Sequence, residues 1–380
     1  MFKKIYQIIF IVIFLGILTA PLIFMNRSKG GVSTEENRVL ATMPSIMDGK
    51  QLNENFTTEF EAYFRDHMGM REELIDWNAK LQFTLFDRML DESFYLIGRN
   101  GDINYANEDM MKDYARLNLR NSKQVEGMGV SYQTISDWLG ERGIPFYYVQ
   151  CYDKHNIYPE QFTDAVIQNG DVSRTDQIMT YLKENTTVNL IDLKPVLLDA
   201  KQHYEVYSNW GDPTHWTDRG AYVGYRYLME QLNQDFDGQF KVLEESDYDI
   251  DFREGGITLN KVIHRDDMLE FFTIKDPQAT KTDVSVLGQW AEDHRHSVWI
   301  NPNAGNDKRL LLICDSYFNN YIIDDLAEGF GEVWLVWGDY IKDLPQLVEH
   351  CQPDLVVFEC VERVERSAAV KELAQSLAQE

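Results

Sequence analysis

Three residues of this chain have side chains that could together carry out nucleophilic catalysis: Ser316, His215 and Asp212. Ser316 follows an apolar run, 310–314, and one aspartate. If that run is a buried strand that turns into a helix, the serine hydroxyl is exposed at the carboxyl edge of a sheet. The first backbone N–H groups of the helix then point at the group that the serine attacks. Because a serine alone is a poor nucleophile, this interpretation requires a base nearby.

The sequence supplies such a base in the segment Asp212-Pro213-Thr214-His215, just before a predicted helix. On a tight turn, a carboxylate three residues before an imidazole can fix its tautomer and leave the other ring nitrogen free to accept the serine proton. Each motif alone also has a structural explanation, because Asp and Ser commonly cap helices and a histidine can pack against a neighbouring tryptophan. Together, the two motifs supply every group that a serine hydrolase needs.

The elements that must position these residues are visible as short apolar runs that alternate with helix-like segments. Strands are predicted at 144–150, 188–193, 309–314, 332–337 and 354–360. Helices are predicted at 174–185, at 220–233, after Ser316 and at 341–350. This alternation indicates an α/β fold with a mostly parallel sheet flanked by helices on both faces. In such folds the functional groups gather at the carboxyl ends of the strands.

The region before the first strand has helical periodicity. Apolar residues recur at helical spacing over 52–90, with a break near Gly69. A short hairpin is predicted at 94–105, centred on Asn100-Gly101. Residues 112–142 are predicted to be helical, with an interruption at Gly127 and Gly129.

The N-terminus carries a segment that could cross a membrane. Lys3 and Lys4 precede an uncharged apolar stretch, 5–25, which would be about 31 Å long as a helix. A cleavable signal peptide usually has a shorter apolar region and a small-residue cleavage site, which 19–21 does not supply. We expect a single-pass anchor over 1–29, a linker with a helical and hairpin segment over 30–110, and a catalytic domain over 111–380. The two lysines predict that this domain is extracytoplasmic.

Charge and cysteine usage narrow the possible partners. The formal net charge is −26, which would repel phosphates and disfavours a nucleic-acid partner.

The four cysteines have no metal-ligand spacing, and an extended strand between Cys351 and Cys360 would hold them about 30 Å apart, too far for a disulfide. We expect four free thiols. The alternating Asp247, Asp249 and Asp251 could attract calcium, but a solvated face of an extended segment is favoured, so no metal or other cofactor is expected.

The two motifs resemble the SGNH hydrolase superfamily, and their order resembles one branch of it. Ordinary members have the serine first and the histidine near the end, whereas here the aspartate and histidine precede the serine. This permuted order resembles the DHHW and alginate O-acetyltransferase (AlgJ and AlgX) family. Further segments are similar to family motifs over about 30–365: Glu36 to Leu40 with Pro44, Phe60 to Arg71, Asp153 to Pro159, His215 to Ala221, and Lys308 to Phe318.

There are also departures from the family pattern. The family usually places the aspartate two residues before the histidine, where this chain has Pro213. Asp218 and Asp192 are therefore fallback candidates for orienting the imidazole. Tyr317 replaces a usual phenylalanine, and Cys314 replaces a usual glycine before the Asp-Ser pair.

The resemblance implies an acetyl group as the group transferred, a polysaccharide or acetylated sugar of the cell envelope as substrate, and a membrane-embedded partner that delivers acetyl groups. Lys154, Tyr317 and Trp216 are candidate substrate-binding residues. For Lys154, a solvated surface position is the alternative, and for the aromatic residues a place in the core is the alternative.

The leading hypothesis is an extracytoplasmic serine acyltransferase or esterase that adds acetyl groups to a cell-envelope polysaccharide or removes them. A carbohydrate-binding or polysaccharide-assembly protein that kept the fold and lost catalysis is the main alternative. A lipase or a peptidase is a third possibility, because the fold and the triad do not by themselves define the substrate.

Overall fold

A computed structural model describes residues 2–26, 31–33, 38–86, 95–255, 257–259, 263–265 and 267–379. The chain divides into two compact units, Met1–Leu90 with Asn260–Ile263, and Asp91–Leu259 with His264–Glu380. The second unit contains all three candidate catalytic residues. Of the segments that resemble family motifs, residues 36 and 37 lie outside the described residues.

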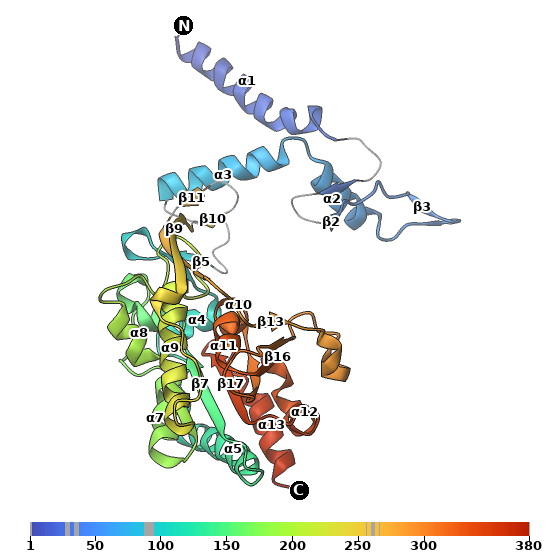
Figure 1. Ribbon diagram of the computed structural model, residues 1–380. Coiled ribbons are helices and arrows are strands. Elements are labelled where there is room, and N and C mark those ends of the chain that lie inside the picture. The colour runs from blue at the N-terminus through green and yellow to red at the C-terminus, as the bar shows by residue number, and fades with distance from the viewer. Residues whose placement is uncertain are drawn as a thin grey trace. The chain divides into compact units, whose positions relative to one another are not determined.

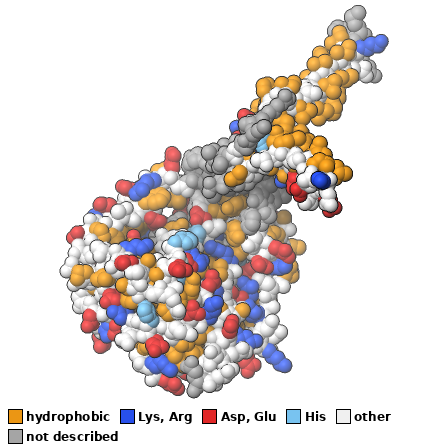
Figure 2. All heavy atoms as spheres, turned by 90° about the vertical axis from the view of Figure 1, so that its right-hand side faces the viewer, with side chains coloured by type: hydrophobic (Ala, Val, Ile, Leu, Met, Phe, Trp, Pro, Cys, Tyr) orange, Lys and Arg blue, Asp and Glu red, His pale blue; other side chains and the backbone are white. Residues whose placement is uncertain are grey.

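The first unit contains the long apolar helix α1 (Phe2–Ile23). Its segment Lys4–Ile23 is long and apolar enough to cross a membrane, with a mean hydropathy of 2.4. Figure 2 shows the side chains of this helix as an almost continuous hydrophobic surface. The helix is therefore a candidate membrane span by its length and composition.

Two further helices of the first unit follow four short strands. The helices are α2 (Phe56–His67) and α3 (Arg71–Phe86), and the strands are β1 (Val32–Ser33), β2 (Arg38–Val39), β3 (Met47–Asp48) and β4 (Gln51–Leu52). The break predicted near Gly69 is confirmed. It includes Met70, whose φ of 58° lies in the left-handed region and cannot continue a helix.

A seven-stranded sheet forms the centre of the second unit, with the strand order β13-β14-β16-β15-β17-β7-β8. Neighbouring strands from β16 to β8 pair in parallel, and β13 and β14 add an antiparallel edge. The strands are β7 (Phe146–Cys151), β8 (Asn189–Asp192), β13 (Thr280–Lys281), β14 (Ser297–Ile300), β15 (Arg309–Cys314), β16 (Glu332–Trp337) and β17 (Leu355–Val361).

Helices cover both faces of this sheet, and each face has its own apolar core (Figure 1). One face packs against α8 (Lys194–Ala200), α9 (Asp218–Asp235), α10 (Ser316–Tyr321) and α11 (Ile323–Gly329). The other packs against α5 (Ser122–Gly140), α7 (Arg174–Asn185), α12 (Leu344–Cys351) and α13 (Ser367–Leu377). The predicted α/β fold with a mostly parallel, doubly covered sheet is confirmed.

The remaining elements lie outside the central sheet and the helices that cover it. The hairpin predicted at 94–105 is present as β5 (Tyr95–Ile97) and β6 (Ile103–Tyr105), while residue 94 lies outside the described residues. A longer antiparallel ribbon, β9 (Tyr248–Glu254) with β12 (Met268–Ile274), was not predicted. The other short elements are α4 (Glu108–Tyr114), α6 (Lys154–Ile157), β10 (Ile257–Leu259), β11 (Ile263–Arg265) and the 3₁₀ turns η1 (Arg99–Gly101), η2 (Pro159–Gln161), η3 (Glu245–Asp247), η4 (Val284–Trp290) and η5 (Gly338–Asp343).

One predicted helix interruption is wrong. The break within 112–142 lies between α4 and α5, and α5 continues through both Gly127 and Gly129. Gly129 is there for packing, because a Cβ at this position would lie 2.3 Å from the ring of Tyr181 on α7. Asn121 begins α5 with a capping box that it shares with Gln124. The four cysteines are free and buried, as predicted.

Buried carboxyl groups make the stability of this fold depend on pH. Burial raises the pKa of Glu205, Asp325 and Glu362 to about 7 in each case. In the unfolded chain such groups titrate near about pH 4. Between these two values the folded state binds more protons than the unfolded state, so the free energy of unfolding falls as pH rises through this window.

We therefore predict a higher melting temperature at about pH 5.5 than at about pH 7.5. Asp325→Asn mimics the protonated group and should flatten part of this dependence. The measurement is thermal unfolding followed by circular dichroism at both pH values. A melting temperature that increases toward pH 7.5 would contradict the prediction.

Candidate active site

Ser316 is positioned by the end of strand β15. The strand ends at Cys314, and Asp315 caps the following helix α10 by accepting a hydrogen bond from the Tyr317 N–H at 3.0 Å. The second oxygen of Asp315 accepts from the Val361 N–H on the adjacent strand at 2.8 Å. Because Asp315 bonds to both sides of the turn, Ser316 is the first helical residue and stands at the carboxyl edge of the sheet.

His215 and Asp212 lie on a loop that the sequence folds into a tight turn. Asp212 Oδ1 accepts from the Thr214 N–H at 2.7 Å and from the Thr214 hydroxyl at 2.5 Å. This is an Asx-type turn, and Pro213 suits its second position because proline already has the required φ. After the turn, Thr217 caps helix α9 by accepting from the Gly220 N–H.

The structure brings the three predicted residues together. His215 Nε2 lies 2.7 Å from Ser316 Oγ, and His215 Nδ1 lies 2.7 Å from Asp212 Oδ2. The carboxylate can accept only if Nδ1 carries the proton, which leaves Nε2 as the acceptor for the serine hydroxyl. Although Asp212 is three residues before the histidine, the Asx turn directs its second oxygen at the imidazole.

Asp212 is ionised at neutral pH. Burial favours its neutral form, but hydrogen bonds from His215 and Thr214 outweigh burial and lower the pKa of Asp212 to about 2. The negative charge therefore stays beside the imidazole over the whole neutral range. A charge in that place stabilises the imidazolium that forms when the histidine accepts a proton.

The two fallback aspartates are engaged elsewhere. Asp192 accepts from the Tyr152 hydroxyl at 2.8 Å, and Asp218 accepts from the Phe272 N–H at 3.1 Å. Among the described residues, Asp212 is the carboxylate that forms a hydrogen bond with His215.

Trp216 and Tyr317, predicted as candidate substrate contacts, belong to the core. Trp216 is 1% exposed and Tyr317 is fully buried, with ring centroids 5.1 Å apart. Tyr317 also packs against the His215 ring at 5.2 Å. Gly220 allows this loop to lie close to its neighbour, since a Cβ there would approach the Val206 carbonyl oxygen to 2.3 Å. The aromatic residues thus support the imidazole from behind.

Lys154 is neither a surface lysine nor exposed to a substrate. Its side chain is buried, and its ammonium group donates to the carbonyl oxygens of Ile103 at 2.9 Å and Ser208 at 2.8 Å. Burial lowers the pKa of Lys154 to about 8. The alternative prediction, that Lys154 is a solvated surface lysine, is wrong. The prediction that Lys154 contacts the substrate has no support either, because its ammonium group joins two chain segments inside the fold.

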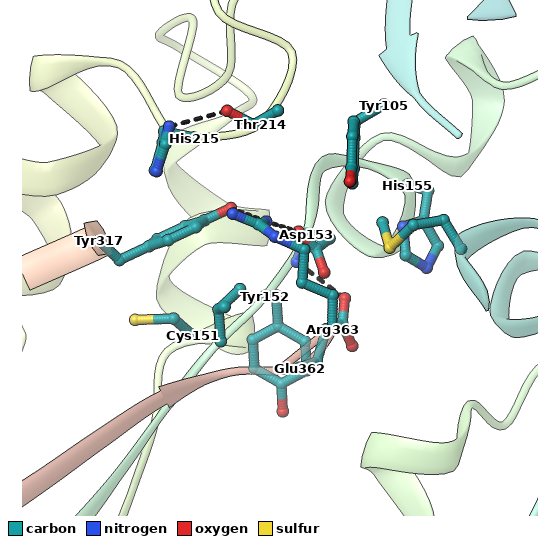
Figure 3. A network of polar contacts seen from close by, with 12 residues as sticks. Tyr105, Cys151, Tyr152, Asp153, His155, Thr214, His215, Tyr317, Glu362 and Arg363 are labelled. Carbon is teal, nitrogen blue, oxygen red and sulfur yellow. Dashed lines mark hydrogen bonds and ion pairs between the residues drawn. The ribbon is translucent and has the colours of Figure 1, made fainter. Parts of the chain in front are cut away.

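A polar network behind Tyr317 was not predicted from the sequence. Arg363, just after β17, forms an ion pair with Asp153 after β7 and lies 3.5 Å from the Tyr317 hydroxyl. Figure 3 shows the Tyr317 ring extending toward this pair, with His215 and Thr214 above the ring in this view. The only sequence signal was the position of these charges, since both follow predicted strands of the same parallel sheet.

Asp113, His155 and Glu362 form a buried group whose side-chain atoms could hold a metal ion. Asn156 already occupies the space between them, and its amide nitrogen lies 3.0 Å from Asp113 and 2.8 Å from Glu362. His155 Nε2 is itself 2.8 Å from Asp113. These contacts engage Asp113 Oδ2, His155 Nε2 and both Glu362 oxygens, whereas Asp113 Oδ1 and His155 Nδ1 have no hydrogen-bond partner among the described residues. The bonded side of the group fits a structural role.

Residues 112–281 match the family model described as the SGNH hydrolase-like domain of the acetyltransferase AlgX. This region is therefore similar to the SGNH hydrolase-like domain of that acetyltransferase, over somewhat less than half of the chain. The match includes Asp212 and His215 and ends before Ser316. The serine is therefore linked to the other two residues by the geometry of the fold.

Solved structures with the same fold include Bacillus cereus PatB1, which is 18% identical. That comparison covers 73% of this chain and 96% of the PatB1 chain, with a TM-score of 0.52. The O-acetyltransferase domain of Pseudomonas putida AlgJ is 13% identical over 75% of this chain and 98% of its own, with a TM-score of 0.47. A DHHW family protein from Eubacterium siraeum is 16% identical over 74% and 93%, with a TM-score of 0.44. No curated protein matches the sequence.

The Thr214 hydroxyl offers a test of the turn that holds Asp212. It donates to Asp212 and lies 2.9 Å from His215 Nδ1. Thr214→Val keeps the shape and removes these contacts, and we predict a fall in kcat of about tenfold with a smaller change in KM. Steady-state hydrolysis of a chromogenic acetyl ester measures both constants.

Thr134→Val, on α5, is the matched control, because among the described residues that hydroxyl bonds to the Val130 carbonyl oxygen of its own helix. Unchanged kcat in Thr214→Val would mean that the threonine does not hold the carboxylate.

Proposed function

We propose that the second unit is a serine O-acetyltransferase, or an acetylesterase, that acts on a polysaccharide of the cell envelope. The observation that carries the proposal is the pair of 2.7 Å contacts from His215 to Ser316 and to Asp212. The family match to an acetyltransferase domain supports acetyl as the transferred group. The likeness to PatB1 supports the fold alone.

In the proposed reaction, Ser316 Oγ attacks the carbonyl carbon of an acetyl ester while its proton passes to His215 Nε2. The tetrahedral intermediate collapses, the donor alcohol leaves with that proton, and an acetyl-serine ester remains. A sugar hydroxyl then gives its proton to Nε2 and attacks the acetyl carbon, and Ser316 recovers its proton as it departs. With water in place of the sugar, the same steps release acetate.

The sequence predicts that the first backbone N–H groups of α10 stabilise the oxyanion, but one of them already has a partner. The Tyr317 N–H already donates to Asp315 and so is engaged in the helix cap. The Ser316 N–H is at the first position of α10, where a backbone N–H has no partner within the helix. We assign the oxyanion contact to this N–H group.

We further propose that α1 anchors the chain in a membrane and that the second unit is extracytoplasmic. The length of Lys4–Ile23 and the lysines before it support this orientation. The similarity to an acetyltransferase domain suggests that a second protein delivers acetyl groups to that side of the membrane. A membrane-embedded acetyl-delivering partner is therefore part of the proposal.

The non-catalytic alternative has less support. It relied on aromatic residues near the motifs that could stack on sugars: Tyr204, Tyr207, Trp210, Trp216 and Tyr317. Tyr207, Trp216 and Tyr317 are buried in the core, while Tyr204 is exposed and Trp210 is half-buried. The geometry of the three polar residues has no comparable structural explanation, because the helix cap is supplied by Asp315 and not by Ser316.

Ser316→Ala should abolish the release of p-nitrophenol from p-nitrophenyl acetate, because the proposed acyl-enzyme forms on the Ser316 hydroxyl. The rate should fall to that of the uncatalysed reaction, measured by absorbance. Ser285→Ala, at an exposed serine, is the matched control and should keep full activity. A serine-directed phosphonate should label the wild type and not Ser316→Ala. Unchanged turnover in Ser316→Ala would end the proposal.

Asp212→Asn should lower kcat by about a thousandfold or more, because the amide favours the wrong imidazole tautomer. KM should change little, since Asp212 would not touch the substrate. Asp192→Asn, at a fallback carboxylate bonded to Tyr152, should retain activity within about threefold, because it does not contact the triad. Equal losses in the two variants would show that Asp212 does not orient His215.

A further inference from the structure

A cleft begins next to the candidate triad and has an unusual lining. Its volume is about 420 Å³, and its walls combine aromatic rings with carboxylates. We call it the acidic cleft and define it by Tyr222, Phe272, Trp299, Tyr321, Asp218 and Asp324, to which Asp325 and Glu328 add further carboxyl groups. None of these residues takes part in the proposed chemistry.

Tyr321 connects the acidic cleft to the reacting atoms. It is the last residue of α10, and its ring centroid lies 5.5 Å from that of His215. Ser316 begins the same helix, five residues earlier, so its Cα is about 8 Å away along the axis. That is the length of one or two sugar units. A sugar bound in the cleft could therefore present a hydroxyl to Ser316 without a change in the fold.

The aromatic part of the lining suits the face of a sugar ring. Trp299 on β14 is half-buried, and its indole N–H is bonded to Ser297 at 3.1 Å, which fixes the ring. Tyr222 and Phe272 stack on each other at 5.1 Å and form part of the wall. Apolar walls with a few convergent polar groups are typical of sites for small ligands, and aromatic faces pack against apolar C–H surfaces.

The charged residues of the lining are all acidic, and Thr273 and Asn320 add uncharged polar groups. Burial and the neighbouring acidic groups raise the pKa of Asp325 to about 7, although the Tyr248 hydroxyl donates to it. Glu328 is 1% exposed, and its Oε2 atom has no hydrogen-bond donor among the described residues beyond an ion pair with Lys241 at 3.5 Å. Carboxylate oxygens accept hydrogen bonds from hydroxyl or amine donors and repel another carboxylate.

A second pocket of about 340 Å³ lies across Trp299 and Tyr321 and includes Lys281, His294 and Arg295. Its positive charge is largely neutralised. Arg295 forms an ion pair with Asp293 at 2.6 Å, and Asp324 belongs to the lining of both pockets. The second pocket therefore does not reverse the preference of the acidic cleft for hydroxyl or amine donors over carboxylates.

We propose that the acidic cleft binds the acceptor sugar, and that this sugar carries a free amine or no charge and is not a uronate. The inference rests on the proposed function and narrows its substrate class to polymers of amino or neutral sugars. The carboxylates receive hydrogen bonds from the amine and hydroxyl groups of the sugar while one ring face lies on Trp299.

The test is binding of three tetrasaccharides of equal length to the full chain in detergent, measured by isothermal titration calorimetry: glucosamine, N-acetylglucosamine and mannuronate. The glucosamine tetramer should bind at least about tenfold more tightly than the mannuronate tetramer, with the N-acetylglucosamine tetramer between them. Equal or tighter binding of mannuronate, or no binding of any tetramer, would overturn the proposal.

Variants of residues in the acidic cleft test whether the sugar binds there. Trp299→Ala and Asp324→Asn should each weaken glucosamine binding by about fivefold to tenfold. Asp171→Asn, at an exposed aspartate outside the cleft, changes the net charge equally and should have no effect. Thermal unfolding of each variant shows whether it is folded. Folded variants with undiminished binding would place the sugar elsewhere and refute the assignment to this cleft.

Hydrolysis of p-nitrophenyl acetate without any sugar separates this proposal from the proposed function. If hydrolysis and Ser316 labelling occur but the three tetrasaccharides do not bind in the expected order of affinity, only the proposed substrate class is refuted. If the tetrasaccharides bind in the expected order of affinity but no hydrolysis occurs, the catalytic proposal is refuted and the cleft remains a sugar-binding site.

Discussion

The hydrogen bond between His215 Nε2 and Ser316 Oγ joins two residues that are 101 positions apart, and the rest of the second unit can be understood as the support for it. Such a contact requires two loops to be held to about half an ångström by rigid elements. The parallel sheet does this because the ends of its central strands lie side by side at one edge. Asp315 then fixes the serine by bonding to α10 and to the end of β17 at once.

This support places several ionisable groups in the interior. Glu359 on β17 is fully buried and accepts from the Asp315 N–H at 2.9 Å, and burial raises the pKa of Glu359 well above its ordinary value. A neutral Glu359 avoids a second negative charge beside Asp315. Arg366, 3.5 Å from Asp315, balances the charge that remains. The turn that presents Ser316 is therefore held by polar bonds on its buried side, while its exposed side is left to the hydroxyl.

Sequence patterns predicted best those elements that local forces decide. The bounds of β15, β16 and α7 were predicted to the residue, because continuous apolar runs define buried strands and Ser173 forms a capping box with Asp176. The β9–β12 ribbon was missed because most of β9 is exposed, although its alternating aspartates were correctly taken as a solvated face of an extended segment. Propensity alone suggested a helix break at Gly127 and Gly129, where packing against Tyr181 decides otherwise.

The candidate site shows the same difference between residues that a local motif reveals and residues that only the fold brings together. Ser316, His215 and Asp212 could be found because each sits in a short motif. The roles of Thr214 and Tyr321 depend on side-chain directions, and the Arg363–Asp153 pair joins residues 210 positions apart, so no local pattern reveals them. Burial of Lys154 was equally invisible, since a lysine after a strand has no sequence feature that distinguishes a surface position from a buried one bonded to two carbonyl oxygens.

The most direct measurement of the central claim is peptide mass spectrometry of the full chain, quenched in acid shortly after mixing with p-nitrophenyl acetate. An acetyl group should be found on Ser316 in the wild type and in a strongly reduced amount in His215→Ala. Acetylation that is absent from Ser316, or that is equal in His215→Ala, would contradict the central claim.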